Sequence, residues 1–267
     1  MTALRAIALV SFLFFQGWLL LSALHIGGVF LDGFETSFLI FALGTGMVSL
    51  LAFILAAFSI FSLAALLVSA AIVDLAVILL GRKGFRWNCR MGKREIAFLV
   101  VLIIAGAILF TPPWKIVFGW SDVGVYADLA AHIKQEGKIT IDSRVVAEVS
   151  EENRDFFYYR ETNRAEKNVY FENQFFVIDD FEKGRLRPWF YFLWPSLMAV
   201  FASFLGVEHL FWAITFVSIL ALWGFFALAR RLFEERWAVA ASVLLALNPV
   251  MLYFSHYTTS EMMNMML

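Results

Sequence analysis

Trp120-Ser121-Asp122-Val123-Gly124-Val125-Tyr126 marks the point where a long apolar part of the chain gives way to a polar loop. A carboxylate placed just past a membrane-spanning helix lies at the rim of the bilayer. There it is partly desolvated, yet it can still meet a lipid-borne phosphate or a dissolved hydroxyl. This stretch therefore separates membrane sequence from loop sequence, and it makes Asp122 a candidate functional residue.

The residues just after Asp122 are typical of a short helix. Gly124 allows the backbone to turn, and the apolar spacing then predicts a helix over Val125 to Lys138 that includes Asp128. Two interpretations of Asp122 remain open at this point. Either it caps this helix, as Ser and Asp commonly do, or it is an acid that takes part in chemistry.

The composition is that of an integral membrane protein. Of the 267 residues 61% are hydrophobic and only 16% are charged, whereas soluble proteins carry about 25% charged residues. The region from Thr111 to Pro188 holds 25 of the 43 formally charged residues, so one loop carries most of the surface that faces water. Cys89 is the only cysteine, which excludes an intramolecular disulfide.

The first part of the chain predicts three membrane spans. Ala6 to Phe30 is uncharged over 25 residues, which is long enough to cross the bilayer. Ser37 to Leu80 is apolar over 44 residues except for Asp74, and this length suits two helices with a turn near Ser59 to Ser62. A carboxylate within a span costs about 2.5 to 3.5 kcal/mol on insertion scales, so Asp74 is expected to face another helix or a water-filled gap.

A basic loop sets the orientation. Gly81 to Arg94 contains six Lys and Arg residues and no acidic residue, and such short basic loops stay on the cytoplasmic side. Ile96 to Phe110 then runs outward, which makes Thr111 to Pro188 extracytoplasmic. Counting three spans back from the basic loop also places the N-terminus outside.

The loop from Thr111 to Pro188 is expected to fold into a small α/β cap over the membrane surface. Tyr170 to Ile178 is aromatic and β-branched enough for a strand, and Asp179 to Gly184 supplies turn residues. Together with the helix predicted after Asp122, these elements are too rich in aromatic residues for a disordered linker.

The segment Trp189 to Gly206 is predicted to lie flat at the outer interface. Trp194-Pro195 interrupts it, and if it crossed the membrane, the basic segment Arg230 to Arg236 would lie outside, whereas basic segments are expected on the cytoplasmic side. Leu210 to Ala229 then runs inward, and Ala238 to Phe254 returns with a bend at Asn248-Pro249. Glu261 follows and reaches the same side as Asp122. The expected organisation is residues 1–94 as N-terminal helices with the basic loop, and residues 95–267 as a core with the loop 111–188 and the interfacial helix 189–206.

The order of motifs resembles the GT-C superfamily of polytopic glycosyltransferases, in particular the protein O-mannosyltransferases and aminoarabinose transferases. The resemblance covers roughly Ile96 to the end. Its parts are Ser121-Asp122-Val123-Gly124-Val125-Tyr126, Gly184-Arg185-Leu186-Arg187-Pro188-Trp189-Phe190-Tyr191, Leu193-Trp194-Pro195-Ser196-Leu197 with Phe204-Leu205-Gly206, Leu228-Ala229-Arg230-Arg231-Leu232-Phe233, and Leu247-Asn248-Pro249 leading to Thr259-Ser260-Glu261. The chain stops within what reads as the first turns of another helix, so we expect it to be the N-terminal part of a longer polypeptide.

The resemblance implies an all-α polytopic membrane enzyme that transfers a sugar from a polyprenyl-phosphate carrier to an acceptor on the extracytoplasmic side, with inversion at the anomeric carbon. In this family the acidic residue of the first outer loop is the proposed general base, a position that Asp122 occupies. The leaving lipid phosphate needs cations, and the candidates are Arg185 and Arg187. Lys115 is a weaker candidate, because a lysine at the membrane interface commonly extends its side chain towards the lipid headgroups. The candidate substrate-binding residues are Tyr126, Arg185, Arg187, His256 and Glu261.

The partners implied are the polyprenyl-phosphate-sugar donor, an acceptor that is protein, lipid or polysaccharide, and the membrane itself, with the prokaryotic plasma membrane as the expected location. Val123 follows Asp122 where many relatives carry a second acidic residue, and no cluster has metal-ligand spacing, so the sequence does not support a cofactor or a divalent metal. Nothing in it suits nucleic-acid binding. The alternative is a non-enzymatic membrane protein whose outer loop binds a ligand or partner. A transporter fits less well, because Asp74 is the lone ionisable group within the spans.

Overall fold

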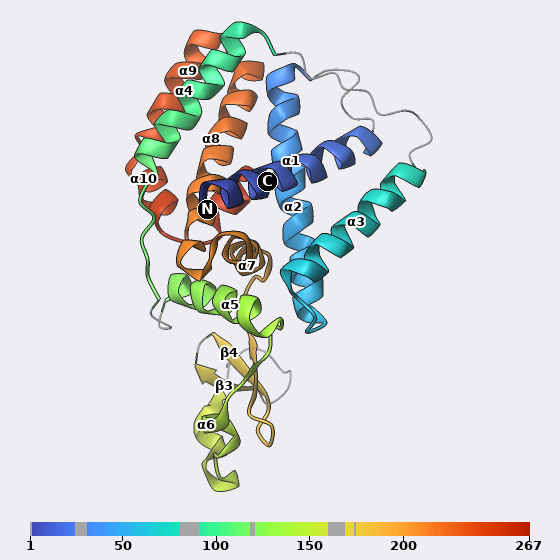
Figure 1. Cartoon of the computed structure of the whole chain (residues 1–267). Helices are drawn as coiled ribbons and strands as arrows, with labels where there is room; N and C mark the ends of the chain where they lie inside the picture. Colours follow the sequence, from blue (N-terminus) through green and yellow to red (C-terminus); the bar gives the residue numbers. More distant parts are fainter. Residues whose placement is uncertain (1, 25–30, 81–90, 118–120, 160–168, 174) are drawn as a thin grey trace.

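The computed structural model describes residues 2–24, 31–80, 91–117, 121–159, 169–173 and 175–267, and for residues 158–159 and 169–173 it describes the backbone alone. Its described part is mostly helical with one small sheet (Figure 1). Trp120, Cys89 and most of the predicted basic loop lie outside the described residues.

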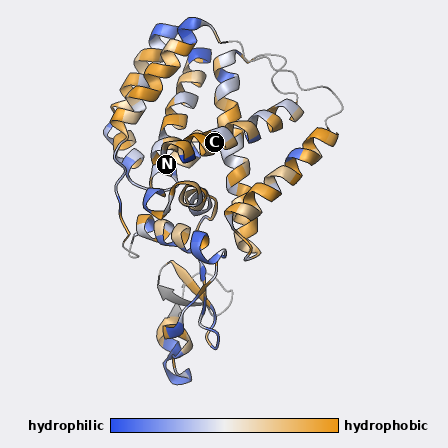
Figure 2. Cartoon of the chain, in the orientation of Figure 1, coloured by the Kyte–Doolittle hydropathy of each residue, from blue (hydrophilic) through white to orange (hydrophobic). Residues whose placement is uncertain are grey.

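Long apolar helices make up the body of the molecule. Their bounds are α1 Thr2–Leu24, α2 Gly33–Ala57, α3 Leu63–Leu80, α4 Lys93–Leu109, α8 Trp212–Leu232, α9 Glu235–Ala246 and α10 Pro249–His256. Within the described residues, four helices are long and apolar enough to cross a membrane: α1, α2, α3, and α8 together with the short turn of helix before it. Figure 2 shows apolar residues along these helices and hydrophilic residues towards their ends. The chain is thus built as a multi-pass membrane protein.

The predicted helix breaks are found at the expected places. The turn after α2 occupies residues 58–62, where Ser59 adopts a positive φ. The bend predicted at Asn248-Pro249 separates α9 from α10, which meet at 59° and could together form a fifth span. The Asn248 side chain caps α10 by accepting a bond from the Val250 amide at 2.8 Å. The outward helix predicted over Ile96 to Phe110 is α4, which has 17 residues and three charged residues in its first turn.

The first two helices approach each other unusually closely, and glycines make this possible. A Cβ built on Gly17 would lie 1.7 Å from the Ile40 carbonyl oxygen, and one built on Gly44 would lie 1.9 Å from the Leu13 carbonyl oxygen. Helix backbones can touch in this way only where side chains are absent, as at small-residue interfaces in membranes. α1 therefore lies directly against α2, across which it runs in Figure 1.

Two further helices lie near the lower end of α8 in Figure 1, where α7 is seen nearly end-on and α5 lies below it. α7 spans Leu193–Leu205, within the predicted interfacial segment, and its 13 residues are too few to cross a bilayer. α5 spans Asp122–Glu136 and packs against α7. Ten of the residues of α7 are buried, among them Trp194, which is 1% exposed. α7 thus belongs to the main apolar core, which draws residues from both predicted parts of the chain.

The polar cap beyond α5 contains a five-stranded sheet. Its strands are β1 Ile141–Asp142, β2 Tyr158–Tyr159, β3 Val169–Asn173, β4 Phe176–Asp180 and β5 Arg185–Pro188, in the spatial order β1-β5-β4-β3-β2 with antiparallel neighbours. The single strand predicted over Tyr170 to Ile178 is therefore wrong, because polar residues near its middle divide it into β3 and β4. The predicted turn Asp179 to Gly184 joins β4 to β5. The short helices α6 Arg144–Ala147 and η2 Glu151–Phe157 complete the cap.

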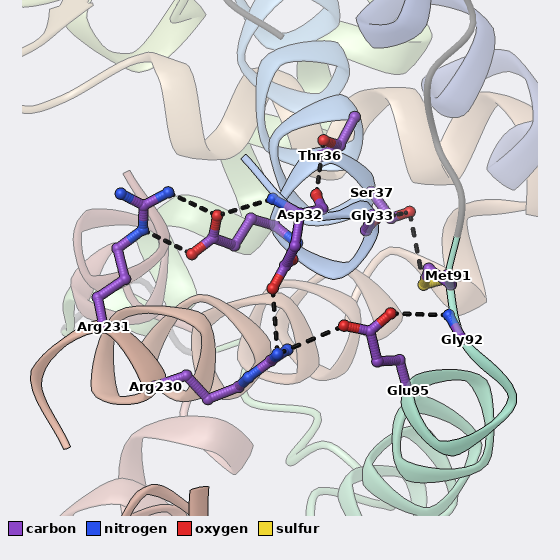
Figure 3. A network of polar contacts seen from close by, with 10 residues as sticks. Asp32, Gly33, Thr36, Ser37, Met91, Gly92, Glu95, Arg230 and Arg231 are labelled. Atoms are coloured by element: carbon purple, nitrogen blue, oxygen red, sulfur yellow. Dashed lines mark hydrogen bonds and ion pairs between the residues drawn. The ribbon is translucent and has the colours of Figure 1, made fainter. Parts of the chain in front are cut away.

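At the opposite end of the bundle, ion pairs hold three helix ends together (Figure 3). Arg231, in the last turn of α8, pairs with Glu35 of α2 through two contacts of 2.6 Å. Arg230 contacts Asp32 at 3.1 Å and Glu95 at 3.4 Å. These acids sit at the first turns of α2 and α4, where a negative charge also favours the helix dipole. The network brings Arg230 and Arg231 to the same end of the bundle as the first turns of α2 and α4.

Candidate functional site

Asp122 lies at the start of α5, where the cap meets the long helices. Ser121 occupies the N-cap position with extended backbone angles, and Asp122 is the first helical residue, with an exposed side chain. Asp122 is therefore not the capping residue itself. The helix ends at Gly137, whose φ of 72° is the left-handed conformation that glycine adopts most readily. The Gly137 carbonyl then accepts a bond from Phe61 at 3.0 Å, which ties α5 to the turn after α2.

Tyr126 is the buried centre of the site. It lies one helical turn after Asp122, is 6% exposed, and packs edge-on against Phe190 with ring centroids 5.0 Å apart. Burial raises the pKa of the Tyr126 hydroxyl, and the charges of Asp122, Glu261 and Tyr191 act in the same direction, while a hydrogen bond with the Ser260 hydroxyl opposes them. Tyr126 is thus kept protonated as a hydrogen-bond donor, close to two carboxyl groups.

The last segment of the chain brings Glu261 to this place. Tyr257 follows α10, and its hydroxyl bonds with Ser121 beside Asp122. Burial raises the pKa of Tyr257, as does the neighbouring Tyr253. The buried indole of Trp194 donates to the Thr258 carbonyl at 3.4 Å, which fixes the chain just before α11 Glu261–Met266. Residues separated by most of the core sequence therefore form one polar cluster, which we call the outer cluster: Ser121, Asp122, Tyr126, Tyr191, Tyr257, Ser260 and Glu261.

His256 has a structural environment. Its Nδ1 lies 2.8 Å from the Leu252 carbonyl, so this nitrogen donates its proton to the carbonyl. The ring lies 5.8 Å from that of Trp114, and the His256 carbonyl accepts a bond from the Trp114 amide at 3.0 Å. The described contacts of His256 thus join α10 to the chain after α4, and they do not link its ring to Asp122.

An aromatic groove of about 550 Å³ lies next to the outer cluster. Phe53 of α2 forms one wall and stacks on Phe192 with ring centroids 5.6 Å apart. Phe190 lines the groove and packs edge-on against Tyr126, so the groove adjoins the outer cluster. The lining residues are Phe53, Arg187, Pro188, Trp189, Phe190, Tyr191, Phe192 and Leu193. The groove is therefore apolar along its length and carries one cation.

The two candidate arginines of β5 differ in position. Arg187 lines the groove, lies over the Trp189 ring at 5.9 Å, and pairs with Asp179 at 3.2 Å. Arg185 is exposed and lies opposite Asp142 in the β1–β5 pair, away from the groove lining. The structure thus brings Arg187, and not Arg185, to the groove. Lys115 is exposed, in agreement with snorkelling.

Comparison with known protein families, curated proteins and solved structures finds no match to this chain. The site is therefore judged on its own chemistry. Within the described residues, no group of three or more His, Cys, Asp and Glu side chains could hold a metal ion. What the outer cluster offers is an exposed carboxylate, a second carboxylate, protonated phenols, and an adjoining apolar groove with a cation.

Sequence reasoning named Asp122, Tyr126 and Glu261, and the structure brings these three together. It missed Phe53 and the roles of Tyr191 and Ser260. Tyr191 and Ser260 stand in the quoted motifs, so their presence at the site was a detectable signal. Phe53 lies in an apolar helix 69 residues before Asp122 and carries no local signal.

Proposed function

We propose that this protein is a membrane glycosyltransferase of the GT-C type. It moves a sugar from a polyprenyl-phosphate donor to an acceptor hydroxyl on the extracytoplasmic side, with inversion. The observation that carries the proposal is the convergence of Asp122 and Glu261 on one cluster that opens into an aromatic groove. A transferase acting on a lipid-linked sugar needs an acid–base group at the membrane rim and an apolar channel beside it, and the two occur here together.

In the proposed reaction, the acceptor oxygen attacks the anomeric carbon while the bond from this carbon to the phosphate oxygen breaks. Asp122 takes the proton of the acceptor hydroxyl, which suits its exposed carboxylate. The products are the glycosylated acceptor, with the opposite anomeric configuration, and polyprenyl phosphate. No step requires an oxidant or a metal.

The aromatic groove would be the binding site of the polyprenyl-phosphate sugar donor. The prenyl chain would lie along Phe53 and Phe192, and the phosphate would approach Arg187, whose planar guanidinium can hold two phosphate oxygens. The pair between Arg187 and Asp179 is partly exposed, with side chains 43% and 34% accessible, and such pairs contribute only about 0–1 kcal/mol. A phosphate can therefore replace Asp179 at little cost.

Tyr126 and Glu261 would position the sugar or the acceptor. A buried phenol that stays protonated donates a hydrogen bond, and a carboxylate accepts bonds from sugar hydroxyls. Their separation in sequence means that the site forms only when the end of the chain packs against α5.

The alternative is a protein that binds a partner through its cap without catalysing a reaction. One observation favours it: Phe156 and Val145, in the short helices of the cap, are 85% and 78% exposed. Such residues would mark a contact surface if they belong to one contiguous apolar patch.

The experiment is a transfer assay with the protein reconstituted in liposomes together with a radiolabelled pool of polyprenyl-phosphate sugars and envelope acceptors. We expect label to leave the lipid fraction, and the product to have the inverted configuration. Liposomes with an Arg187→Gln variant should need more donor for half-maximal rate, while Lys115→Gln, an exposed cation outside the groove, should behave as the parent. If the parent transfers no label from any donor of this class, the proposal is wrong. Loss of binding to envelope proteins on Phe156→Ser would then support the alternative.

A further inference from the structure

One polar contact lies among the apolar helices, far along the sequence from the outer cluster. The Gln16 side chain of α1 donates from Nε2 to Oδ2 of Asp74 in α3 at 2.9 Å. Gln16 is 2% exposed. Both helices are long and apolar enough to cross a membrane, and the contact is partly buried between them, so in a bilayer its uncovered side would face lipid and not water.

The two oxygens left over in this pair have no partner among the residues that the structure describes. Gln16 Oε1 and Asp74 Oδ1 are both buried and make no hydrogen bond to any of them. An ionised carboxylate only accepts hydrogen bonds, as does an amide oxygen, so an ionised Asp74 leaves both atoms unsatisfied. Buried unsatisfied groups and unpaired buried charges are each strongly unfavourable.

The surroundings supply no charge to balance an ionised Asp74. α3 packs against α1, α2 and α7. Along their described lengths these three helices carry only Arg5 and Glu35 as ionisable residues. Glu35 is paired with Arg231, and no ion pair to Asp74 occurs among the described side chains.

We propose that Asp74 is a proton-binding site within the membrane helices, protonated at neutral pH on Oδ1, and that this proton is donated to Gln16 Oε1. The protonated acid and the amide then form a cyclic pair with two hydrogen bonds. A carboxyl and an amide group are both planar, so when their planes align the observed bond on one side places the two remaining oxygens within reach of each other. One proton satisfies both buried atoms and removes the charge.

With this pairing, the strength of the contact between α1 and α3 depends on whether Asp74 is protonated. Loss of the proton breaks one of the two bonds and leaves a charge among apolar side chains. The proton therefore acts as a ligand of the folded arrangement, and α3 stays attached to α1 while it is bound.

Infrared spectroscopy of the protein in lipid tests the proposal, because a protonated carboxyl has a C=O stretching band that a carboxylate lacks. At neutral pH the parent minus Asp74→Asn difference spectrum should contain this band, and Gln16→Leu should shift it to higher frequency as its hydrogen bond is lost. Asp74→Asn can form the same cyclic pair through its amide, so it should retain the fold. A difference spectrum without the band would overturn the proposal, and so would a band that Gln16→Leu leaves unshifted.

A pH series gives a second readout that a merely structural role would not produce. The parent should lose thermal stability at alkaline pH relative to Asp74→Asn, whose amide pair has no proton to lose. Equal stability of the two proteins across alkaline pH would contradict the proposal.

Discussion

Replacing Gly44 by alanine should separate the first two helices. The Cβ that alanine adds would lie 1.9 Å from the Leu13 carbonyl oxygen, whereas real Cβ atoms essentially never approach closer than 3.0 Å. The obstacle is backbone of a helix, which cannot rotate away as a side chain can. The α1–α2 interface must therefore open by about 1 Å, a gap that forfeits about a quarter to a half of each dispersion contact across it.

The size of the effect follows from two opposing terms. Overpacking a well-filled interface costs about 1–3 kcal/mol. Alanine regains up to about 1 kcal/mol because it is a better helix former than glycine. The expected net loss for Gly44→Ala is about 0–2 kcal/mol, with the upper part of this range favoured because the obstacle is backbone.

Gly46 provides a matched control in the same helix. A Cβ on Gly46 meets only a side-chain atom of Leu267 at 3.9 Å, which is ordinary contact. Gly46→Ala should therefore be neutral or stabilise by up to about 1 kcal/mol. Unfolding curves of the purified protein in mixed micelles of increasing SDS content measure both changes. If the two variants have equal stability, the close approach of α1 and α2 is wrong.

Two further predictions concern charged residues. Arg231→Ala should lower the melting temperature more than Arg236→Ala in a thermal-shift assay. Arg231 pairs with Glu35, whose side chain is 11% exposed, whereas Arg236 pairs with Glu234, whose side chain is 69% exposed, and exposed ion pairs contribute little to stability. Equal losses in the two variants would contradict the network. Partial desolvation raises the pKa of Asp128, although its side chain remains exposed on the helix, so its small contribution to stability is fully present below its unfolded pKa of about 3.9 and is lost as pH rises through the folded pKa. Asp128→Asn should accordingly raise the melting temperature at neutral pH, and the gain should vanish in acid; a gain that is independent of pH would refute this reasoning.

Much of the helical framework could be predicted from local sequence. The polar residues near Ser59 and the Asn248-Pro249 pair mark breaks in apolar runs, and proline and asparagine act there through local backbone geometry. The helix after Asp122 begins three residues earlier than predicted, because Gly124 fits within its first turn.

The parts that sequence reasoning missed depend on contacts between distant residues. Nothing near Arg231 signals that it binds Glu35, 196 positions away. No strand is predicted after the turn Asp179 to Gly184, yet Arg185–Pro188 forms β5, with β4 and β1 on either side of it.

The candidate site also contains residues that the sequence predicts and an arrangement that it does not. Asp122 and Glu261 could be assigned to one side of the membrane by counting helices, which is why both were named. Their meeting around Tyr126 depends on the packing of α7 against α5, which no local pattern encodes. The substrate-binding roles predicted for Arg185 and His256 rested on the resemblance alone. In the structure Arg185 lies opposite Asp142 and the His256 ring contacts the Leu252 carbonyl, so neither lies at the groove or beside Asp122.

The rate of sugar transfer by Asp122→Asn is the sharpest test of Asp122 as the general base of a glycosyltransferase. Asparagine keeps the size and polarity of the side chain in the first turn of α5 but cannot take a proton. The control is Asp128→Asn, an aspartate of the same helix outside the outer cluster. With both variants at equal expression, we expect Asp122→Asn to lower turnover by about 10² to 10⁴ while Asp128→Asn retains it. Parental turnover in Asp122→Asn would contradict the claim that this carboxylate is the general base.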